Sequence, residues 1–195
     1  MKKLLLLLVL FPFYMFAQEP EYIGEVNLMY GSKVLKMDKE YMSSATRADA
    51  GLILFGIGSE HSKIVVPGRV ATTRVPEKTE FHIIARAMDN NSDPMSVVRV
   101  FKFETHHNSR RAEVANADVF GSSNQRFKSI KFNAVKYGKS SYDILFSFLP
   151  VGEYGVIVSN PNSRDSRSTL IYCFGVGDPK KSNNWRYYGS DGVYN

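Results

Sequence analysis

The sequence predicts an all-β protein. Runs of β-branched and aromatic residues recur along the 195-residue chain, separated by Gly, Pro, Asn, Asp and Ser, a spacing typical of sandwiches and barrels. No long segment has a convincing helical period, and no internal repeat is evident. The composition, 44% hydrophobic and 23% charged, is that of a globular domain and excludes a disordered chain, a collagen-like repeat or a disulfide scaffold.

Two stretches alternate between apolar and other residues and are the clearest strands. In 141–148 every second residue from Tyr142 is aromatic or aliphatic, and in 153–158 the same holds from Tyr154. Because successive side chains of a strand point to opposite faces, each stretch is expected to bury one side.

The remaining strands follow from shorter β-branched and aromatic runs. They are expected at 22–29, 33–37, 52–57, 62–66, 70–75, 80–88, 96–104, 111–119, 127–135 and 169–176. The runs around Ile83 and Val97 are apolar on both faces, which predicts central positions in the sheets. Segment 38–50 fits either a strand or a short helical turn.

The first residues resemble an export signal. Met1-Lys2-Lys3 is followed by an apolar run over 4–16, shorter than the roughly 20 residues that span a bilayer. The pattern predicts a signal peptide over 1–17 and a periplasmic or extracellular protein. A retained leader that acts as an anchor and a buried N-terminal strand are the alternatives. No later segment is expected to cross a membrane.

The charge of the chain gives little information about its partners. The formal net charge is +6, and two of the lysines belong to the predicted leader. A mildly basic protein associates readily with acidic partners, but this names none. The basic residues are scattered and form no stripe with aromatic platforms, so a nucleic-acid partner is not expected.

The single cysteine, Cys173, lies within the apolar run 170–174. It cannot form an internal disulfide, and we expect a small hydrophobic residue of a buried strand. A reactive thiol and an intermolecular bridge are the alternatives. Stability must then come from the apolar core.

The segment Leu149-Pro150-Val151-Gly152-Glu153-Tyr154 joins the two alternating stretches. It resembles the tyrosine corner of immunoglobulin-like and fibronectin type III-like sandwiches, in which a tyrosine hydroxyl bonds back to nearby backbone. Val156 stands where antibody domains have a cysteine, and the expected central strand has no tryptophan. The resemblance implies an antiparallel β-sandwich over 61–177 and no particular activity.

The resemblance also implies an order of strands. Strands B and C would be 80–88 and 96–104, and strands E, F and G would be 141–148, 153–159 and 169–176. The B–C and F–G loops would then emerge at one end. Around this domain the sequence predicts a short N-terminal β extension or small subdomain over 18–60 and a flexible, aromatic-containing tail over 178–195.

Long polar loops at one end of a sandwich suggest a surface for a protein partner. The candidate partner-binding residues, which could make directional contacts to a charged surface, are Asp89, Asn91, Asp93, Arg164, Asp165 and Arg167. An alternative is a glycan or small-ligand site that uses the aromatic residues of the tail, Trp185, Tyr187 and Tyr188.

No cofactor is expected. Asp89, Asn91 and Asp93 have a spacing that can offer oxygens to calcium, but the Gly and Glu that a hand-type loop requires are absent. A calcium site completed by Asp165 remains a minor alternative to simple turns. No histidines have zinc spacing, and no Gly-x-Ser-x-Gly elbow is present. A non-enzymatic module is therefore expected, with a hydrolase whose site is assembled in space as the remaining alternative.

Overall fold

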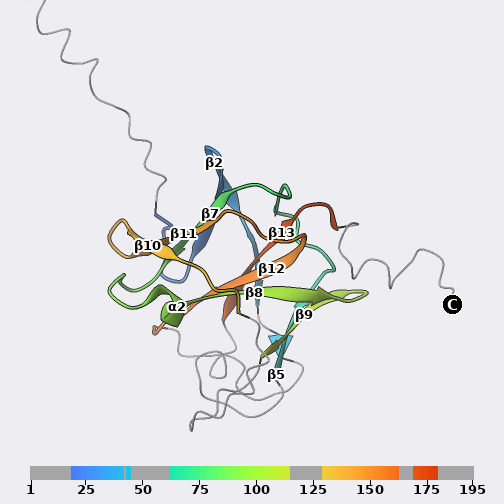
Figure 1. The fold of residues 1–195 in the computed structure, drawn as a ribbon. Helices are drawn as coiled ribbons and strands as arrows, with labels where there is room; N and C mark the ends of the chain where they lie inside the picture. Colours follow the sequence, from blue (N-terminus) through green and yellow to red (C-terminus); the bar gives the residue numbers. More distant parts are fainter. Residues whose placement is uncertain (1–18, 42, 45–61, 115–128, 163–168, 180–195) are drawn as a thin grey trace, which may run out of the picture.

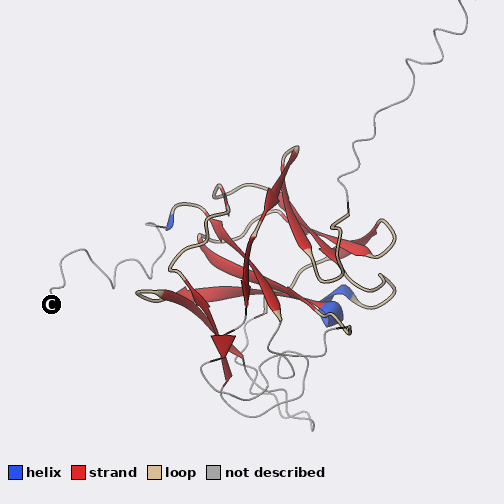
Figure 2. Ribbon diagram, turned by 180° about the vertical axis from the view of Figure 1, so that it is seen from behind, coloured by secondary structure: helices blue, strands red, loops and turns tan. Residues whose placement is uncertain are grey.

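The computed structural model describes residues 19–41, 43–44, 62–114, 129–162 and 169–179. Two sheets pack against each other in a sandwich-like arrangement, and all but one of the pairs between their strands are antiparallel (Figures 1 and 2). The predicted all-β class is confirmed. No helix in these ranges is long and apolar enough to cross a membrane.

The first sheet has five strands. Its order is β10 (Ala134–Tyr137), β11 (Ser141–Phe146), β7 (Phe81–Arg86), β1 (Val26–Tyr30) and β2 (Lys33–Lys36). Strand β7 is central, as the two apolar faces around Ile83 predicted.

The second sheet is larger and curls. Its order is β3 (Asp38–Tyr41), β13 (Leu170–Val176), β12 (Gly152–Val158), β8 (Val98–Thr105), β9 (Ser109–Val114), β5 (Ser62–Pro67) and β4 (Ser43–Ser44), with β6 (Arg74–Val75) parallel to β13. Strands β3 and β4 stand at opposite ends of this order but are almost consecutive in the chain. The sheet therefore bends round until its two ends approach each other.

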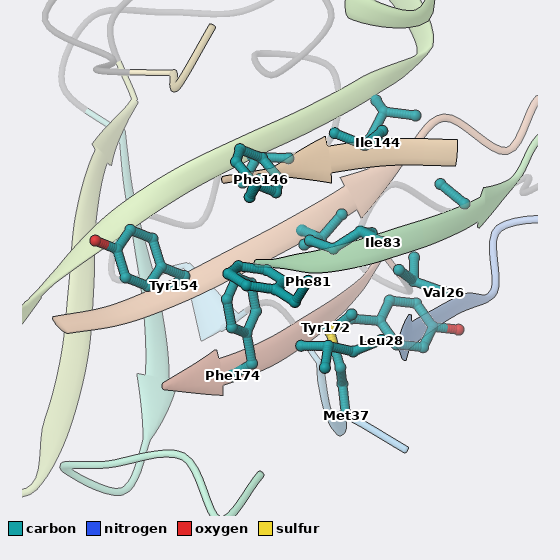
Figure 3. Close-up of a cluster of buried hydrophobic side chains, with 14 of the residues drawn as sticks. Val26, Leu28, Met37, Phe81, Ile83, Ile144, Phe146, Tyr154, Tyr172 and Phe174 are labelled. Carbon is teal, nitrogen blue, oxygen red and sulfur yellow. The ribbon is translucent and has the colours of Figure 1, made fainter. Parts of the chain in front are cut away.

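The main core fills the space between the two sheets, where the facing side chains are apolar or aromatic (Figure 3). The ring centroids of Phe81 and Phe146 lie 5.5 Å apart, and those of Tyr154 and Phe174 lie 5.4 Å apart. Each such aromatic pair stabilises the fold by about 0.5–1.5 kcal/mol beyond the contribution of its buried area. We call this set the inter-sheet core.

A second buried cluster lies on the other face of the curled sheet. It is small, and its members are Ile64, Val66, Ala71, Phe101, Phe103, Ala112, Ile157, Ile171 and Cys173. We call it the curl core. Strand β12 contributes to both clusters, and all seven of its residues are buried. The expectation that 153–158 buries one side only is therefore wrong, because the curled sheet covers its second face.

Several boundaries differ from the sequence expectations. The strand expected at 127–135 is β10, four residues long and displaced toward 137; of the described residues before it, Ser129 makes an isolated bridge to Phe101. The strand expected at 70–75 is reduced to β6. A short helix, α2 (Pro94–Val97), was not expected. The Asp93 side chain accepts a hydrogen bond from the Met95 N–H, and Pro94 fits the first helical turn.

The chain before Ser62 joins both sheets. Strand β1 pairs with β7, and β3 pairs with β13. The described part of 38–50 forms strands β3 and β4, so the strand alternative is correct there. The strand expected at 52–57 lies outside the described residues.

Candidate functional site

Four segments meet at the end of the sandwich where α2 lies. The Ser159 N–H donates to the Val97 carbonyl (2.8 Å), which joins the start of the loop after β12 to the end of the loop before β8. The Gly24 N–H donates to the Arg86 carbonyl (2.8 Å), and the Ala87 N–H donates to the Ser140 carbonyl (2.9 Å). We call this end the loop pole, formed by 19–25, 86–97, 137–141 and 159–162. The end of the loop before β8 and the start of the loop after β12, which were expected at one pole, therefore lie side by side.

The first loop of the pole, between β7 and α2, contains the candidate residues Asp89, Asn91 and Asp93. Two of them form hydrogen bonds to the backbone of this same loop. The Asp89 carboxylate accepts a hydrogen bond from the Asn91 N–H (2.8 Å), and the Asp93 carboxylate accepts one from the Met95 N–H (2.8 Å). The Asn91 side-chain oxygen accepts one from Lys136 Nζ (3.2 Å). These are the local turns that Asp and Asn favour. They hold exposed carboxylates in a defined backbone.

A buried tyrosine anchors the same loop to the sandwich. The Tyr142 hydroxyl donates to the Ser92 carbonyl (2.7 Å), and its ring belongs to the inter-sheet core. Burial raises the pKa of Tyr142, and the Asp89 carboxylate adds to the shift. Its hydroxyl therefore stays protonated and keeps donating at physiological pH.

The other candidate residues lie outside the part of the chain that the structure describes. Arg164, Asp165 and Arg167 lie outside the described residues, and so do the tail residues Trp185, Tyr187 and Tyr188. Within the described ranges, no group of three or more His, Cys, Asp or Glu side chains could hold a metal ion. Asp89 and Asp93 act there as turn formers.

The sequence interpretation missed the segment that follows the predicted leader. The Glu19 carboxylate accepts a hydrogen bond from the Ser140 N–H (3.1 Å), and Arg86 Nη1 donates to the Pro20 carbonyl (2.7 Å). A Cβ atom at Gly138, whose φ is +57°, would lie 2.2 Å from Glu19 Oε1. The turn thus needs glycine both for its backbone and for this contact. Gly138 marks the turn in the sequence, but no sequence pattern indicated that Glu19 packs against it.

The opposite end of the molecule holds a buried ionic cluster. Glu153, 2% exposed, lies 2.6 Å from Arg74 Nη1 through one oxygen and accepts the Ala71 N–H through the other (2.6 Å). Arg110, 1% exposed, lies 3.9 Å from the same carboxylate and donates to the carbonyls of Pro67 and Gly68. The cluster therefore fixes the loop between β5 and β6 over the curl core.

Cys173 belongs to the curl core and is fully buried. Burial raises the pKa of its thiol to about 12. The thiol is therefore protonated at neutral pH and out of reach of oxidants. The expectation of a small core residue is confirmed.

The outer face of the five-stranded sheet carries a histidine–carboxylate pair. His82 Nδ1 lies 2.8 Å from Asp143 Oδ1. A base held by a carboxylate is one part of a hydrolytic site, but a nucleophile must also be within reach. The residues in register beside His82 are Met29 and Leu145, neither of which is a nucleophile.

The same outer face exposes apolar side chains at both edges of the sheet. Val34 on β2 is 47% exposed, and Val135 on β10 is 65% exposed. Leu145 on β11, next to β10, is 44% exposed. The polar His82–Asp143 pair lies on the face between these two edges, so the exposed apolar side chains occupy separate positions.

Comparison of the chain with protein-family models, with curated proteins and with solved structures gave no match.

Proposed function

We propose that this chain is an exported, non-enzymatic binding or assembly module that engages a protein partner through its loop pole. The observation that carries the proposal is the junction at Val97 and Ser159, which brings two polar loops from distant parts of the sequence to one end. Function commonly resides in loops that a rigid scaffold holds in place.

The electrostatics of the first loop support a partner with donor or basic groups. Asp89 and Asp93 are exposed and are fixed by backbone hydrogen bonds through one oxygen each. A preorganised carboxylate loses little conformational freedom when a partner binds, which favours affinity. Two exposed apolar side chains from the same pole, Tyr22 and Met88, would add contact area.

We also propose the finer classification of the fold as an immunoglobulin-like or fibronectin type III-like sandwich. It is supported by three pairings, β7 with β11, β8 with β12 and β12 with β13, which are those of strands B–E, C–F and F–G in such domains. It is also supported by the Tyr154 hydroxyl, which donates to the Pro150 carbonyl. Many domains of this architecture bind other proteins, but architecture alone carries no function.

The test is photo-crosslinking in cells that export the protein. A photoreactive residue replaces Asn162, which is exposed at the loop pole, and in a control it replaces His107, which is exposed in the hairpin at the opposite end. We expect one reproducible protein adduct from position 162 and none from 107. The same adduct from both positions, or none from 162 with a crosslinker that works on a known complex, would contradict the proposal.

A second variant separates charge from folding. The double change Asp89→Asn and Asp93→Asn keeps an oxygen that can accept the Asn91 and Met95 N–H groups but removes both charges. We expect capture to fall while the melting temperature changes little. Unchanged capture would exclude these carboxylates from the partner surface.

A further inference from the structure

The two edges of the five-stranded sheet differ in how far the protein itself covers them. At the β2 edge the Thr73 hydroxyl donates to the Lys36 carbonyl (2.6 Å). At the β10 edge, β11 is the sole strand partner within the described residues. Within the described residues, strand β10 is thus an edge strand whose backbone pairs with β11 on one side.

An open edge presents backbone N–H and C=O groups that can pair with another strand. The side chains of β10 determine which strand would fit. Val135 points to the outer face, in register with Asp143, whereas Ala134 and Lys136 point to the inner face, in register with Ile144 and Tyr142. A strand added here would therefore place alternate residues beside an apolar group and beside an ammonium group.

The segment that contains β10 carries charge of one sign, although two carboxylates border it: Asp143 is in register with Val135, and Glu19 lies against Gly138. The sequence from 129 to 140 contains three lysines and no acidic residue. Lys131, Lys136 and Lys139 are all exposed. A second copy of β10 would bring like charges together, which is unfavourable. An acidic segment would bring opposite charges together and would be attracted over a distance.

We propose that β10 is a docking edge for an extended acidic segment of a protein partner, which adds to the five-stranded sheet as a further strand. The segment alternates apolar and acidic residues, with an apolar side chain against Val135 and a carboxylate beside Lys136. Main-chain hydrogen bonds supply affinity, and the alternating side chains supply specificity.

The edge is continuous with the loop pole. Lys136 Nζ donates to the Asn91 side-chain oxygen (3.2 Å), so the first loop positions the lysine that the segment meets. The inference therefore rests on the proposed function and names the form of the partner: a strand at β10, with neighbouring groups against the loop.

The test uses a short synthetic peptide of alternating Glu and Val, labelled for fluorescence anisotropy and titrated with the exported chain. We expect saturable binding that weakens as salt is added. A Lys–Val peptide and a peptide with its Glu residues in one block should bind at least about tenfold more weakly. The alternating peptide with N-methylated backbone amides should not bind, because it cannot complete the ladder.

Matched variants locate the site. Val135→Asp should weaken peptide binding by about tenfold or more, because it places a carboxylate against an apolar side chain and acidic neighbours. Val34→Asp makes the same change at the covered edge and should leave binding unaltered. Equal loss in the two variants, no saturable binding, or equal binding of the N-methylated peptide would each overturn the inference.

The failure of this inference can be told from failure of the proposed function. A partner that is still captured at position 162 by the Val135→Asp variant would refute the docking edge and leave the loop pole standing. Loss of capture in that variant, with an unchanged melting temperature, supports both.

Discussion

The inter-sheet core and the curl core lie on opposite faces of the same sheet, yet they are built on different principles. The inter-sheet core is large, and its side chains face each other across two sheets (Figure 3). The curl core is small, and its open end is closed by Glu153, Arg74 and Arg110. A large apolar cluster can stabilise through area alone, whereas a small one at the end of a curled sheet depends on specific polar contacts.

Glycine has a different use in each part of the curl. At Gly155, the rings of Phe101 and Phe103 cover the backbone, and a Cβ atom would lie 2.6 Å from Phe101. At Gly175, a Cβ atom would lie 2.1 Å from Arg74 Nη1, so glycine leaves the path along which Arg74 reaches Glu153. The curl core is therefore packed tightly against its own backbone.

The largest effect is expected from Glu153→Ala. It leaves the buried Arg110 and the half-buried Arg74 without their shared carboxylate and the Ala71 N–H without its acceptor, which should lower the free energy of unfolding by about 3–5 kcal/mol. Urea unfolding measures it. Glu104→Ala, at an exposed position of β8, is the matched control and should cost less than about 1 kcal/mol. Equal effects would mean that the ionic cluster does not hold the curl.

The inter-sheet core should respond to loss of volume. Leu28 is fully buried, and Leu28→Ala should lower the free energy of unfolding by roughly 3 kcal/mol, through lost transfer energy and a cavity. High salt should leave this loss unaltered. Val34→Ala, exposed on the next strand, should be nearly neutral. A loss below about 1 kcal/mol for Leu28→Ala would indicate that this core repacks freely.

A smaller effect should come from adding a methyl group to the curl core. Gly155→Ala forces Phe101 and Phe103 to move and should cost about 1–3 kcal/mol. Thermal unfolding measures it, and Phe101→Leu should recover part of the loss by making room. If the double variant is no more stable than Gly155→Ala alone, the cost lies in the backbone and not in the rings.

The smallest effect concerns the contribution of the Glu25 carboxylate to stability at acid pH. Burial acts to raise the pKa of Glu25, but the N–H groups of Tyr22 and Glu21 and the ammonium groups of Lys39 and Lys36 outweigh it, so the pKa is lowered from 4.5. This stabilisation is present above pH 4.5 and is lost as the pH falls through the lowered pKa. Between pH 7 and pH 3 the free energy of unfolding should fall less for Glu25→Gln than for the unchanged chain, by up to about 1 kcal/mol. Melting temperatures measured across this pH range test the difference. Parallel curves would exclude this carboxylate from the acid response.

Local pattern was enough to predict the strands of the inter-sheet core. Alternation marked β11 and β12, and runs apolar on both faces marked β7 and β8 as central. The curl could not be foreseen, because it depends on pairings between segments far apart in the chain, such as β13 with β3 and β5 with β9. Glu153 therefore looked like the polar side of a half-exposed strand, although it is buried.

The candidate site was predicted to a similar extent. Asn, Asp and Pro between 89 and 95 indicated turns, and Asp89, Asn91 and Asp93 do make them. The docking of Glu19 on Ser140 gave no pattern, because it joins segments 121 residues apart. The edge position of β10 was missed because the strand was expected over 127–135, which left Lys136 and Tyr137 outside it.

Strand β12 is buried on both faces and belongs to both cores. Neither core can be dismantled while this strand stays paired with β8 and β13. Its amide protons should accordingly exchange with solvent deuterium only through opening of the whole molecule, at the free energy of global unfolding. The edge strand β10 should exchange through smaller openings. The two buried clusters then unfold as one cooperative unit, so a substitution that loosens either cluster lowers the free energy of unfolding of the whole molecule.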